Sequence, residues 1–187
     1  MLNYQSAIKS DKLYSDLTIK EISPIMKLNI RGKSREFLTT IGKNINMILP
    51  VEANTSSSSD KYTSMWLSPD EWLVISNKSV DKENNNYEIE ELLFNKISKN
   101  NLGAVVDVSD QFVLLNLKGK KVFDLLSTGC PFDFSDFKKK KGAVAQTLLT
   151  QVDIIIHHKE LNNINLFVRR SFSEHLMSWI DDAASRL

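Results

Sequence analysis

The chain has 187 residues, 42% of them hydrophobic, and is therefore long enough to bury a core as one domain or as two small halves. Its 24 basic and 23 acidic side chains leave a formal net charge of +1, which excludes a strong overall attraction to nucleic acid or anionic lipid. A single cysteine, Cys130, excludes an intramolecular disulfide and a multi-cysteine zinc site.

The N-terminal stretch MLNYQSAIKSDKLYSD, residues 1–16, is polar and has no repeating pattern, so we predict a flexible segment. It lacks the basic segment and apolar run of a secretory signal. No stretch of the sequence approaches the roughly 18 consecutive apolar residues of a membrane-spanning helix. We therefore expect a cytoplasmic protein with no membrane partner.

Two stretches repeat each other without gaps, LNIRGKSREFLTTIG (Leu28–Gly42) and LNLKGKKVFDLLSTG (Leu115–Gly129). The identical pairs are Leu28/Leu115, Asn29/Asn116, Gly32/Gly119, Lys33/Lys120, Leu38/Leu125 and Gly42/Gly129. Each copy predicts an alternating strand, a tight turn at the first glycine, and an amphipathic helix that ends at the second glycine in a left-handed C-cap. Such a repeat predicts two similar halves.

The sequence around the two copies is also similar. LTIKEISPIMKLNI and AVVDVSDQFVLLNL each predict a hairpin that leads into the glycine turn. Downstream, YTSMWL with EWLVIS and AQTLLTQVDIIIHH with INLFVRRSF predict one further hairpin in each half. YEIEELLFNKISKN and SEHLMSWIDDAASRL predict the helices that follow. The order ββαββα therefore occurs twice.

This order predicts an α+β protein of two pseudo-symmetric ββαββα halves, in which helices pack on antiparallel sheets. We expect the flexible segment at 1–16, the first half at 17–102 and the second half at 103–187, forming one compact two-lobed unit. The boundary falls in SKNNLG, near Asn100–Gly103, where one helix ends before the next strand.

The stretch MWLSPDEWLV places two acids between two tryptophans. Pro69 at the second position, with local hydrogen bonds from Ser68 and Asp70, predicts a β-turn. Adjacent carboxylates in a turn usually diverge, so Asp70 and Glu71 are poor candidates for acid–base catalysis. Trp66 and Trp72 either cover the chain's own core or contact a partner.

Other candidate sites are weak. Cys130 has no neighbouring histidine in the sequence to activate it, which favours a small buried side chain. His157 and His158 are consecutive on a predicted strand and point to opposite faces, so they do not chelate one metal ion. The run Lys138–Lys141 favours a solvated loop, with an acidic patch on a protein partner as the alternative. No phosphate-binding or nucleophile motif is present in the sequence.

Several segments in the same order resemble one family. They are WLSPDEWLV, VVDVSDQFVLLNLKG, LLSTGCPFDF, AQTLL and FVRRSFSEHLMSWIDDAA, which cover most of the chain from about Leu28 onward. Together they are similar to the gamma subunit of heterotetrameric sarcosine oxidase. The sequence departs from that pattern in its serine tract and in the lysine run before Gly142.

The resemblance implies a non-catalytic accessory subunit of a complex that oxidatively demethylates sarcosine to glycine, with transfer of the C1 unit to tetrahydrofolate. It implies that FAD, FMN, NAD and tetrahydrofolate are bound by the partner subunits and none by this chain. The partners implied are the alpha, beta and delta subunits, mainly alpha, with no nucleic acid. The implied fold is similar to the folate-binding region of aminomethyltransferases.

Two hypotheses follow for the function of the chain. As an accessory subunit, it is expected to contact its partner through Trp66, Trp72, Arg169 and Arg170, chosen by residue type and motif position. The alternative is a free-standing folate-binding or aminomethyltransferase-like C1-transfer protein, which needs a pocket with a convergent carboxylate. Asp107 and Asp110 are the candidates for that carboxylate.

Overall fold

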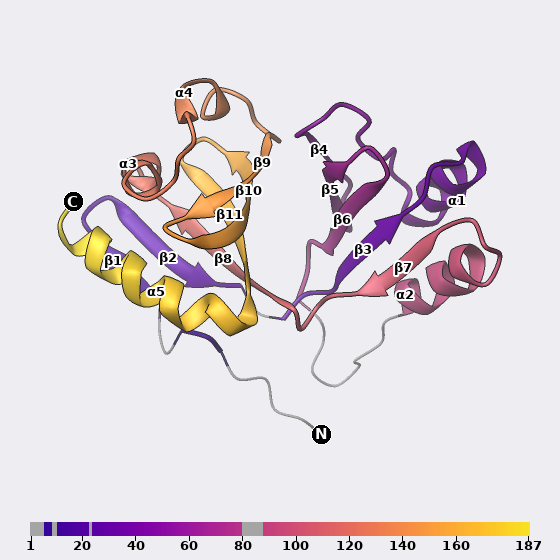
Figure 1. The fold of residues 1–187 in the computed structure, drawn as a ribbon, viewed down its shortest axis with the longest axis horizontal. Coiled ribbons are helices and arrows are strands. Elements are labelled where there is room, and N and C mark those ends of the chain that lie inside the picture. The colour runs from indigo at the N-terminus through magenta and orange to yellow at the C-terminus, as the bar shows by residue number, and fades with distance from the viewer. Residues whose placement is uncertain (1–5, 9–10, 23, 80–87) are drawn as a thin grey trace. The chain divides into compact units, whose positions relative to one another are not determined.

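The computed structural model describes residues 6–8, 11–22, 24–79 and 88–187, and the chain forms two compact units (Figure 1). Unit 1 contains the chain up to Ile22 and again from Gln111 to Leu187, whereas unit 2 is Ser23–Asp110. These boundaries differ from the predicted division at residues 102 and 103, because one strand before each repeat joins the sheet of the other unit.

Unit 1 contains a six-stranded antiparallel sheet with the strand order β1-β2-β8-β11-β10-β9. The strands are β1 Lys12–Tyr14, β2 Leu17–Glu21, β8 Phe112–Lys118, β11 Asn163–Arg169, β10 Val152–Glu160 and β9 Val144–Leu149. Its helices are α3 Val122–Ser127, α4 Phe134–Phe137 and α5 Arg170–Ser185. The core lies where alternate residues of β8, such as Leu115 and Leu117, join a cluster with Leu125 of α3 and Ile180 of α5.

Unit 2 contains a five-stranded antiparallel sheet with the strand order β4-β5-β6-β3-β7. The strands are β4 Ser56–Ser58, β5 Tyr62–Ser68, β6 Glu71–Ser76, β3 Lys27–Arg31 and β7 Ala104–Asp107. Its helices are α1 Arg35–Ile45 and α2 Glu88–Leu93, which continues as the π-helical turn η1 Phe94–Ser98. Leu28 and Ile30 of β3 pack in one cluster with Phe37 and Ile41 of α1 and with Trp72 of β6.

The predicted hairpins before the two repeats are wrong, although all four strands exist. β2 pairs with β8 in unit 1, with Ile19 opposite Leu117, and β7 pairs with β3 in unit 2, with Val106 opposite Asn29. The segments between β2 and β3 and between β7 and β8 are therefore connections between units. This exchange preserves the doubling, because β2-β8-β11-β10-β9 has the same arrangement as β7-β3-β6-β5-β4.

The α+β class with two similar antiparallel sheets is confirmed, but each half contains a further strand. The predicted strand AQTLLTQVDIIIHH is two strands, β9 and β10, because Thr150 adopts a left-handed φ of 61° and reverses the chain. In unit 2 the serine tract supplies β4, which pairs with β5.

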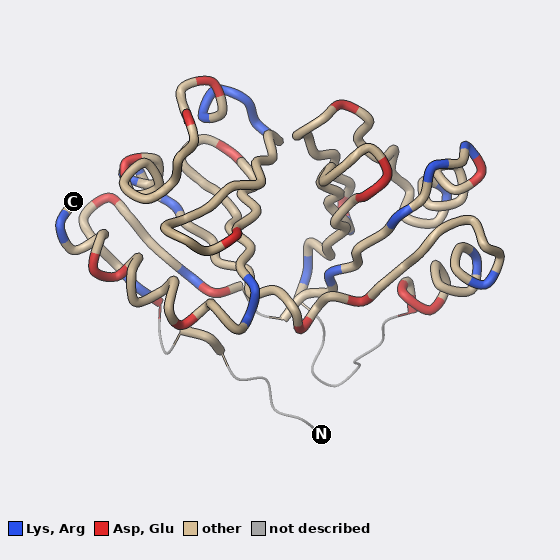
Figure 2. Tube along the Cα trace, viewed as in Figure 1, with Lys and Arg blue, Asp and Glu red and all other residues tan. Residues whose placement is uncertain are grey.

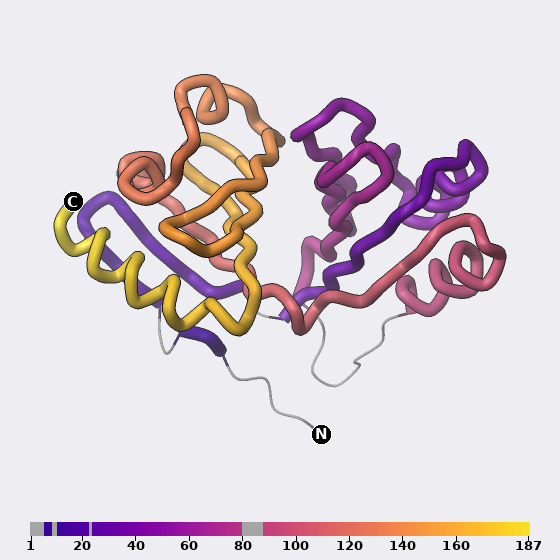
Figure 3. The backbone as a smooth tube through the Cα atoms, in the orientation of Figure 1, coloured from indigo at the N-terminus to yellow at the C-terminus, as the bar shows by residue number. Residues whose placement is uncertain are grey.

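Part of the predicted flexible segment is also a strand. β1 lies beside α5 at the indigo and yellow ends of the tube in Figure 3, where the Tyr14 hydroxyl donates to the Asp181 carboxylate. Lys12 pairs with the same carboxylate at 3.2 Å. Residues 1–5 and 9–10 of that prediction lie outside the described residues.

The predicted glycine C-caps are wrong. Gly42 lies inside α1, and the C-cap is Asn46 with φ 51° and ψ 48°, because asparagine also tolerates the left-handed conformation. Gly129 has no positive φ; a Cβ there would lie 2.7 Å from the Trp179 ring. Gly119 does need its residue type, since its φ is +139° and a Cβ would lie 2.0 Å from the Asp16 carbonyl oxygen.

Candidate functional site

The tip of the β5–β6 hairpin in unit 2 confirms the turn predicted for SPDE. Ser68 lies opposite Glu71 across the hairpin, and the Ser68 hydroxyl donates to the Asp70 carboxylate at 2.9 Å. A register shift between Trp66 and Ser68 marks a bulge just before the turn. The turn residues therefore hydrogen-bond one another, as their side-chain chemistry favours.

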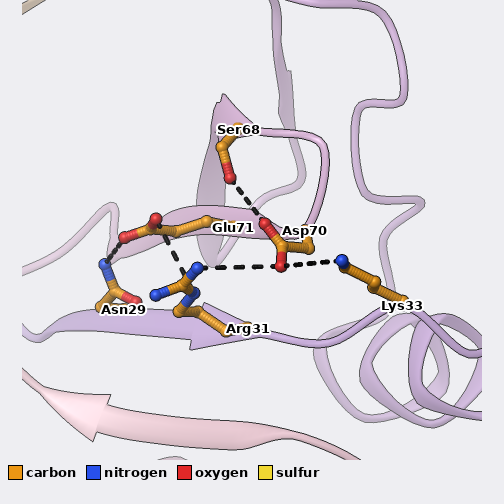
Figure 4. A network of polar contacts seen from close by, with 6 residues as sticks. All are labelled: Asn29, Arg31, Lys33, Ser68, Asp70 and Glu71. Carbon is orange, nitrogen blue, oxygen red and sulfur yellow. Dashed lines mark hydrogen bonds and ion pairs between the residues drawn. The ribbon is translucent and has the colours of Figure 1, made fainter.

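The two acids of this turn contact β3 and the residues just after it (Figure 4). Asp70 lies 3.7 Å from Arg31 and 3.7 Å from Lys33, and Glu71 lies 3.8 Å from Arg31. Asn29 donates to Glu71 at 2.6 Å, and the backbone N–H of Gly32 donates to the Asp70 carbonyl at 3.0 Å.

The electrostatics of this cluster suit a structural role for Asp70. The hydrogen bond from Ser68, followed by the charges of Lys33 and Arg31, lowers the pKa of Asp70. A carboxylate held in its ionised form is a poor proton donor near neutral pH. The two acids fasten the hairpin tip to the end of β3.

Trp72 is buried in unit 2, which corrects its selection as an interface residue. Its side chain is 3% exposed, and its ring centroid lies 6.1 Å from that of Phe37. Trp66 lies directly opposite Trp72 on the same face of the sheet, where α1 covers the strands. Trp66 keeps partial exposure at the edge of that core, and its contact with a partner stays a prediction.

Trp72 also supports a surface feature that the sequence analysis missed. Its Nε1–H donates to the Pro50 carbonyl at 2.7 Å, the Ser57 hydroxyl donates to the Ile48 carbonyl at 2.6 Å, and the Met47 N–H donates to the Gly42 carbonyl at 3.1 Å. These bonds hold the extended segment that follows α1.

The segment directs two large apolar side chains into solvent. Ile48 is 85% exposed and Val51 is 79% exposed, whereas Met47 and Leu49 are buried in the core of unit 2. We call Ile48 and Val51 the apolar ledge. An apolar surface held in a fixed conformation is typical of a site where another protein binds.

A groove of about 630 Å³ lies beside the ledge. It is lined by Leu38, Thr39, Gly42, Lys43, Asn46, Met47, Ile48, Leu49 and Val51. Lys43 is the one ionisable side chain in this lining, so the groove suits an apolar segment with a carboxylate nearby. The signal in the sequence was MILPV, an apolar run outside every predicted helix and strand.

The predicted interface arginines lie in unit 1. Arg169 is exposed at the end of β11, and Arg170 is half-buried at the start of α5. The Arg170 N–H donates to the Gln111 carbonyl at 2.8 Å. Their location is compatible with a partner contact, which stays a prediction.

The carboxylates proposed for folate binding lie in exposed positions. Asp107 accepts the Ser109 N–H at 2.8 Å and forms a local turn. Neither Asp107 nor Asp110 lines the groove at the ledge or the hollow of about 700 Å³ beside Tyr62 and Ile89.

Other reactive side chains are inside the protein. Cys130 is buried in the core of unit 1, and that burial raises the pKa of its thiol to about 12. Within the described ranges, no three His, Cys, Asp or Glu side chains are grouped to hold a metal ion. Nor does any helix in the described part of the chain have the length and apolar character to span a membrane.

Two solved structures have a similar fold. A chain of the heterotetrameric sarcosine oxidase from Corynebacterium sp. U-96, solved in complex with pyrrole 2-carboxylate, is similar with a TM-score of 0.80 and 21% identity. The match covers 91% of this chain and 84% of that one. The glycine cleavage system aminomethyltransferase T from Bartonella henselae is similar with a TM-score of 0.62 and 13% identity.

The second match covers 89% of this chain but 46% of the aminomethyltransferase, so this chain corresponds to about half of that protein. It confirms the predicted similarity to an aminomethyltransferase fold. A search of curated proteins found no match. The model of the sarcosine oxidase, gamma subunit family matches residues 32–186, which include most of the first repeat, the whole second repeat, the SPDE turn and the apolar ledge. The chain therefore belongs to the sarcosine oxidase, gamma subunit family.

Proposed function

We propose that this chain is a non-catalytic accessory subunit of a heterotetrameric sarcosine oxidase, which oxidatively demethylates sarcosine to glycine and transfers the C1 unit to tetrahydrofolate. The observation that carries the proposal is the family match over residues 32–186. The fold similarity to a chain of the Corynebacterium enzyme, over most of both chains, supports it.

The apolar ledge is the surface through which this subunit docks on another subunit. Ile48 and Val51 are the two most exposed aliphatic side chains among the described residues of unit 2, and three hydrogen bonds fix the segment that bears them. When a contact surface is already rigid, binding loses little free energy to the ordering of its side chains and backbone. The groove with Lys43 beside the ledge gives the partner both an apolar contact and a charge to match.

The proposal extends to partners and cofactors. The chain associates with the alpha, beta and delta subunits, mainly alpha, in the cytoplasm. FAD, FMN, NAD and tetrahydrofolate are held by those partners. The chain itself contributes stability and assembly to the complex and no reacting group.

Co-expression of the tagged chain with the three partner subunits tests the proposal. We expect all four polypeptides to co-purify in equal amounts and to oxidise sarcosine. The double variant I48D/V51D places two charges on the ledge, so we expect at least a tenfold loss of recovered complex. Its unfolding temperature as an isolated chain should match the wild type, because both side chains project into solvent.

Leu161→Asp is the matched control, since Leu161 is 78% exposed on the turn between β10 and β11 of unit 1. Complex recovery should stay at the wild-type level in this variant. Equal recovery of the complex for I48D/V51D and wild type would mean that the apolar ledge is not a docking surface. Absence of co-purification of the wild-type chain, together with saturable tetrahydrofolate binding by the isolated chain, would instead favour the C1-transfer alternative.

A further inference from the structure

The run Lys138–Lys141 forms an ordered turn of unit 1 directly after α4. All four side chains are exposed, and they form the blue stretch that follows α4 in Figure 2. Their backbone continues the turn of α4: the N–H groups of Lys138, Lys139 and Lys140 donate to Phe134, Asp136 and Phe137 at 3.0, 3.1 and 3.1 Å. We call Lys138–Lys141 the lysine knob.

His158 of strand β10 contacts the lysine knob and the residues on either side of it. The Nδ1–H of His158 donates to the Lys140 carbonyl at 2.8 Å, since a carbonyl only accepts. The backbone of His158 accepts from Gly142 and donates to Ala143, both at 2.8 Å. The His158 ring stacks on Phe137 with centroids 5.7 Å apart.

Among the described residues, the lysine knob has one ion pair and a few acidic neighbours. The pKa of Asp133 is lowered by hydrogen bonds from Ser135 and then by the charges of Lys138 and Lys139. Lys139 pairs with Asp136 at 3.0 Å; for the other three lysines, the described residues provide no ion pair. Glu160 lies near further cations, since its pKa is lowered by a hydrogen bond from Asn163 and then by the charges of Lys118, Lys159 and Lys141. Like charges held close together repel one another unless an anion approaches.

We propose that the lysine knob is a docking surface for an acidic segment of another subunit of the complex, which it attracts before the apolar contact forms. This inference rests on the proposed function. A carboxylate-rich protein segment fits better than a phosphate backbone, because nucleic-acid binding needs a wide basic surface and the chain's net charge is only +1.

Charges at the rim of an interface act mainly on the association rate and its salt dependence. The test immobilises the complex of the three partner subunits on a biosensor and measures binding of this chain from about 30 to 300 mM salt, a range over which screening of surface charges changes strongly. For the variant K138Q/K139Q/K140Q/K141Q we expect an association rate about tenfold lower at low salt, a weaker salt dependence and a nearly unchanged dissociation rate.

Two controls separate local charge from net charge. K138R/K139R/K140R/K141R keeps the charge of the knob and should associate at the wild-type rate. K61Q/K78Q/K96Q/K99Q removes the same number of charges from exposed positions of unit 2 and should change the association rate less than threefold.

An unchanged association rate and salt dependence in the glutamine variant of the knob would overturn the inference while leaving the proposed function intact. The same holds if that variant loses binding to single-stranded DNA or anionic vesicles but associates normally with the partner complex. Failure of the wild-type chain to bind the partner complex at all would overturn the proposed function and this inference with it.

Discussion

The two copies of the repeat, Leu28–Gly42 and Leu115–Gly129, share a topology but meet different local demands. In unit 2 the helix α1 has 11 residues and is capped by Ser34, whose hydroxyl accepts the Phe37 N–H at 3.0 Å. In unit 1 the equivalent helix α3 has 6 residues, and the equivalent residue, Lys121, makes no capping hydrogen bond through its side chain. Shared sequence therefore sets the order of elements, whereas local contacts set their lengths and ends.

Substitution of the turn glycines, Gly119 and Gly32, should give the largest difference in free energy of unfolding between the two copies. Gly119→Ala places a Cβ 2.0 Å from the Asp16 carbonyl oxygen at a φ of +139°. We expect the free energy of unfolding to fall by about 3 kcal/mol or more. Gly32→Ala places a Cβ 2.5 Å from the ring of buried Phe37, which must repack, but it meets no backbone atom and needs no positive φ, so we expect a smaller loss of about 2 kcal/mol. Urea unfolding measures both; equal losses would contradict the comparison.

The two tryptophans of the β5–β6 hairpin should differ next. Trp72→Phe removes the hydrogen bond to the Pro50 carbonyl as well as part of a buried ring, so we expect a loss of about 2 kcal/mol. Trp66→Phe removes part of a half-exposed ring and should cost less than about 1 kcal/mol. Hydrogen exchange should also increase in Met47–Val51 for Trp72→Phe. A larger loss at Trp66 would contradict this order, and unchanged exchange in Met47–Val51 would mean that the ledge does not depend on Trp72.

The helix caps provide a smaller contrast between the copies. Ser34→Ala removes the cap of α1 and should lower the free energy of unfolding by about 1 kcal/mol. Lys121→Ala, at the equivalent position of α3, should change it by less than about 0.5 kcal/mol, because no side-chain cap is lost. Thermal or urea unfolding of the two single variants checks this order, which a similar loss in both would contradict.

The smallest expected effect is on the pH dependence of the free energy of unfolding. The pKa of Asp70 is lowered in the folded chain, so its contribution to stability is present above its unfolded pKa and is lost as the pH falls through the folded one. We expect Asp70→Asn to reduce stability slightly at pH 7, with the difference from wild type shrinking at pH 3. A difference that grows at pH 3 would show that the carboxylate is not favoured by Ser68, Lys33 and Arg31.

The sequence predicted those features that depend on local chemistry. The strand, glycine and helix order of each repeat, the Ser68–Glu71 turn and the burial of Cys130 all follow from periodicity and side-chain type. The exchange of β2 and β7 between units could not be predicted this way. Two strands close in sequence look like a hairpin, and their true partners depend on which faces become buried in the whole fold.

The candidate interface was predicted less well than the fold. Trp72 was chosen by residue type, but an antiparallel register that puts it opposite Trp66 under α1 buries its ring. Ile48 and Val51 were overlooked because an aliphatic residue near Pro50 carries no chemical motif. Their exposure follows from hydrogen bonds to Trp72 and Ser57 that join segments distant in the sequence.

Site-specific photo-cross-linking in the co-expressed complex tests the docking surface most directly. A photoreactive amino acid is incorporated in turn at Ile48, Val51 and the control position Leu161, and cross-linked peptides are identified by mass spectrometry. We predict cross-links to another subunit from Ile48 and Val51 and none from Leu161. Cross-links to a partner from Leu161 alone, in a fully assembled complex, would contradict the assignment of the apolar ledge as the docking surface.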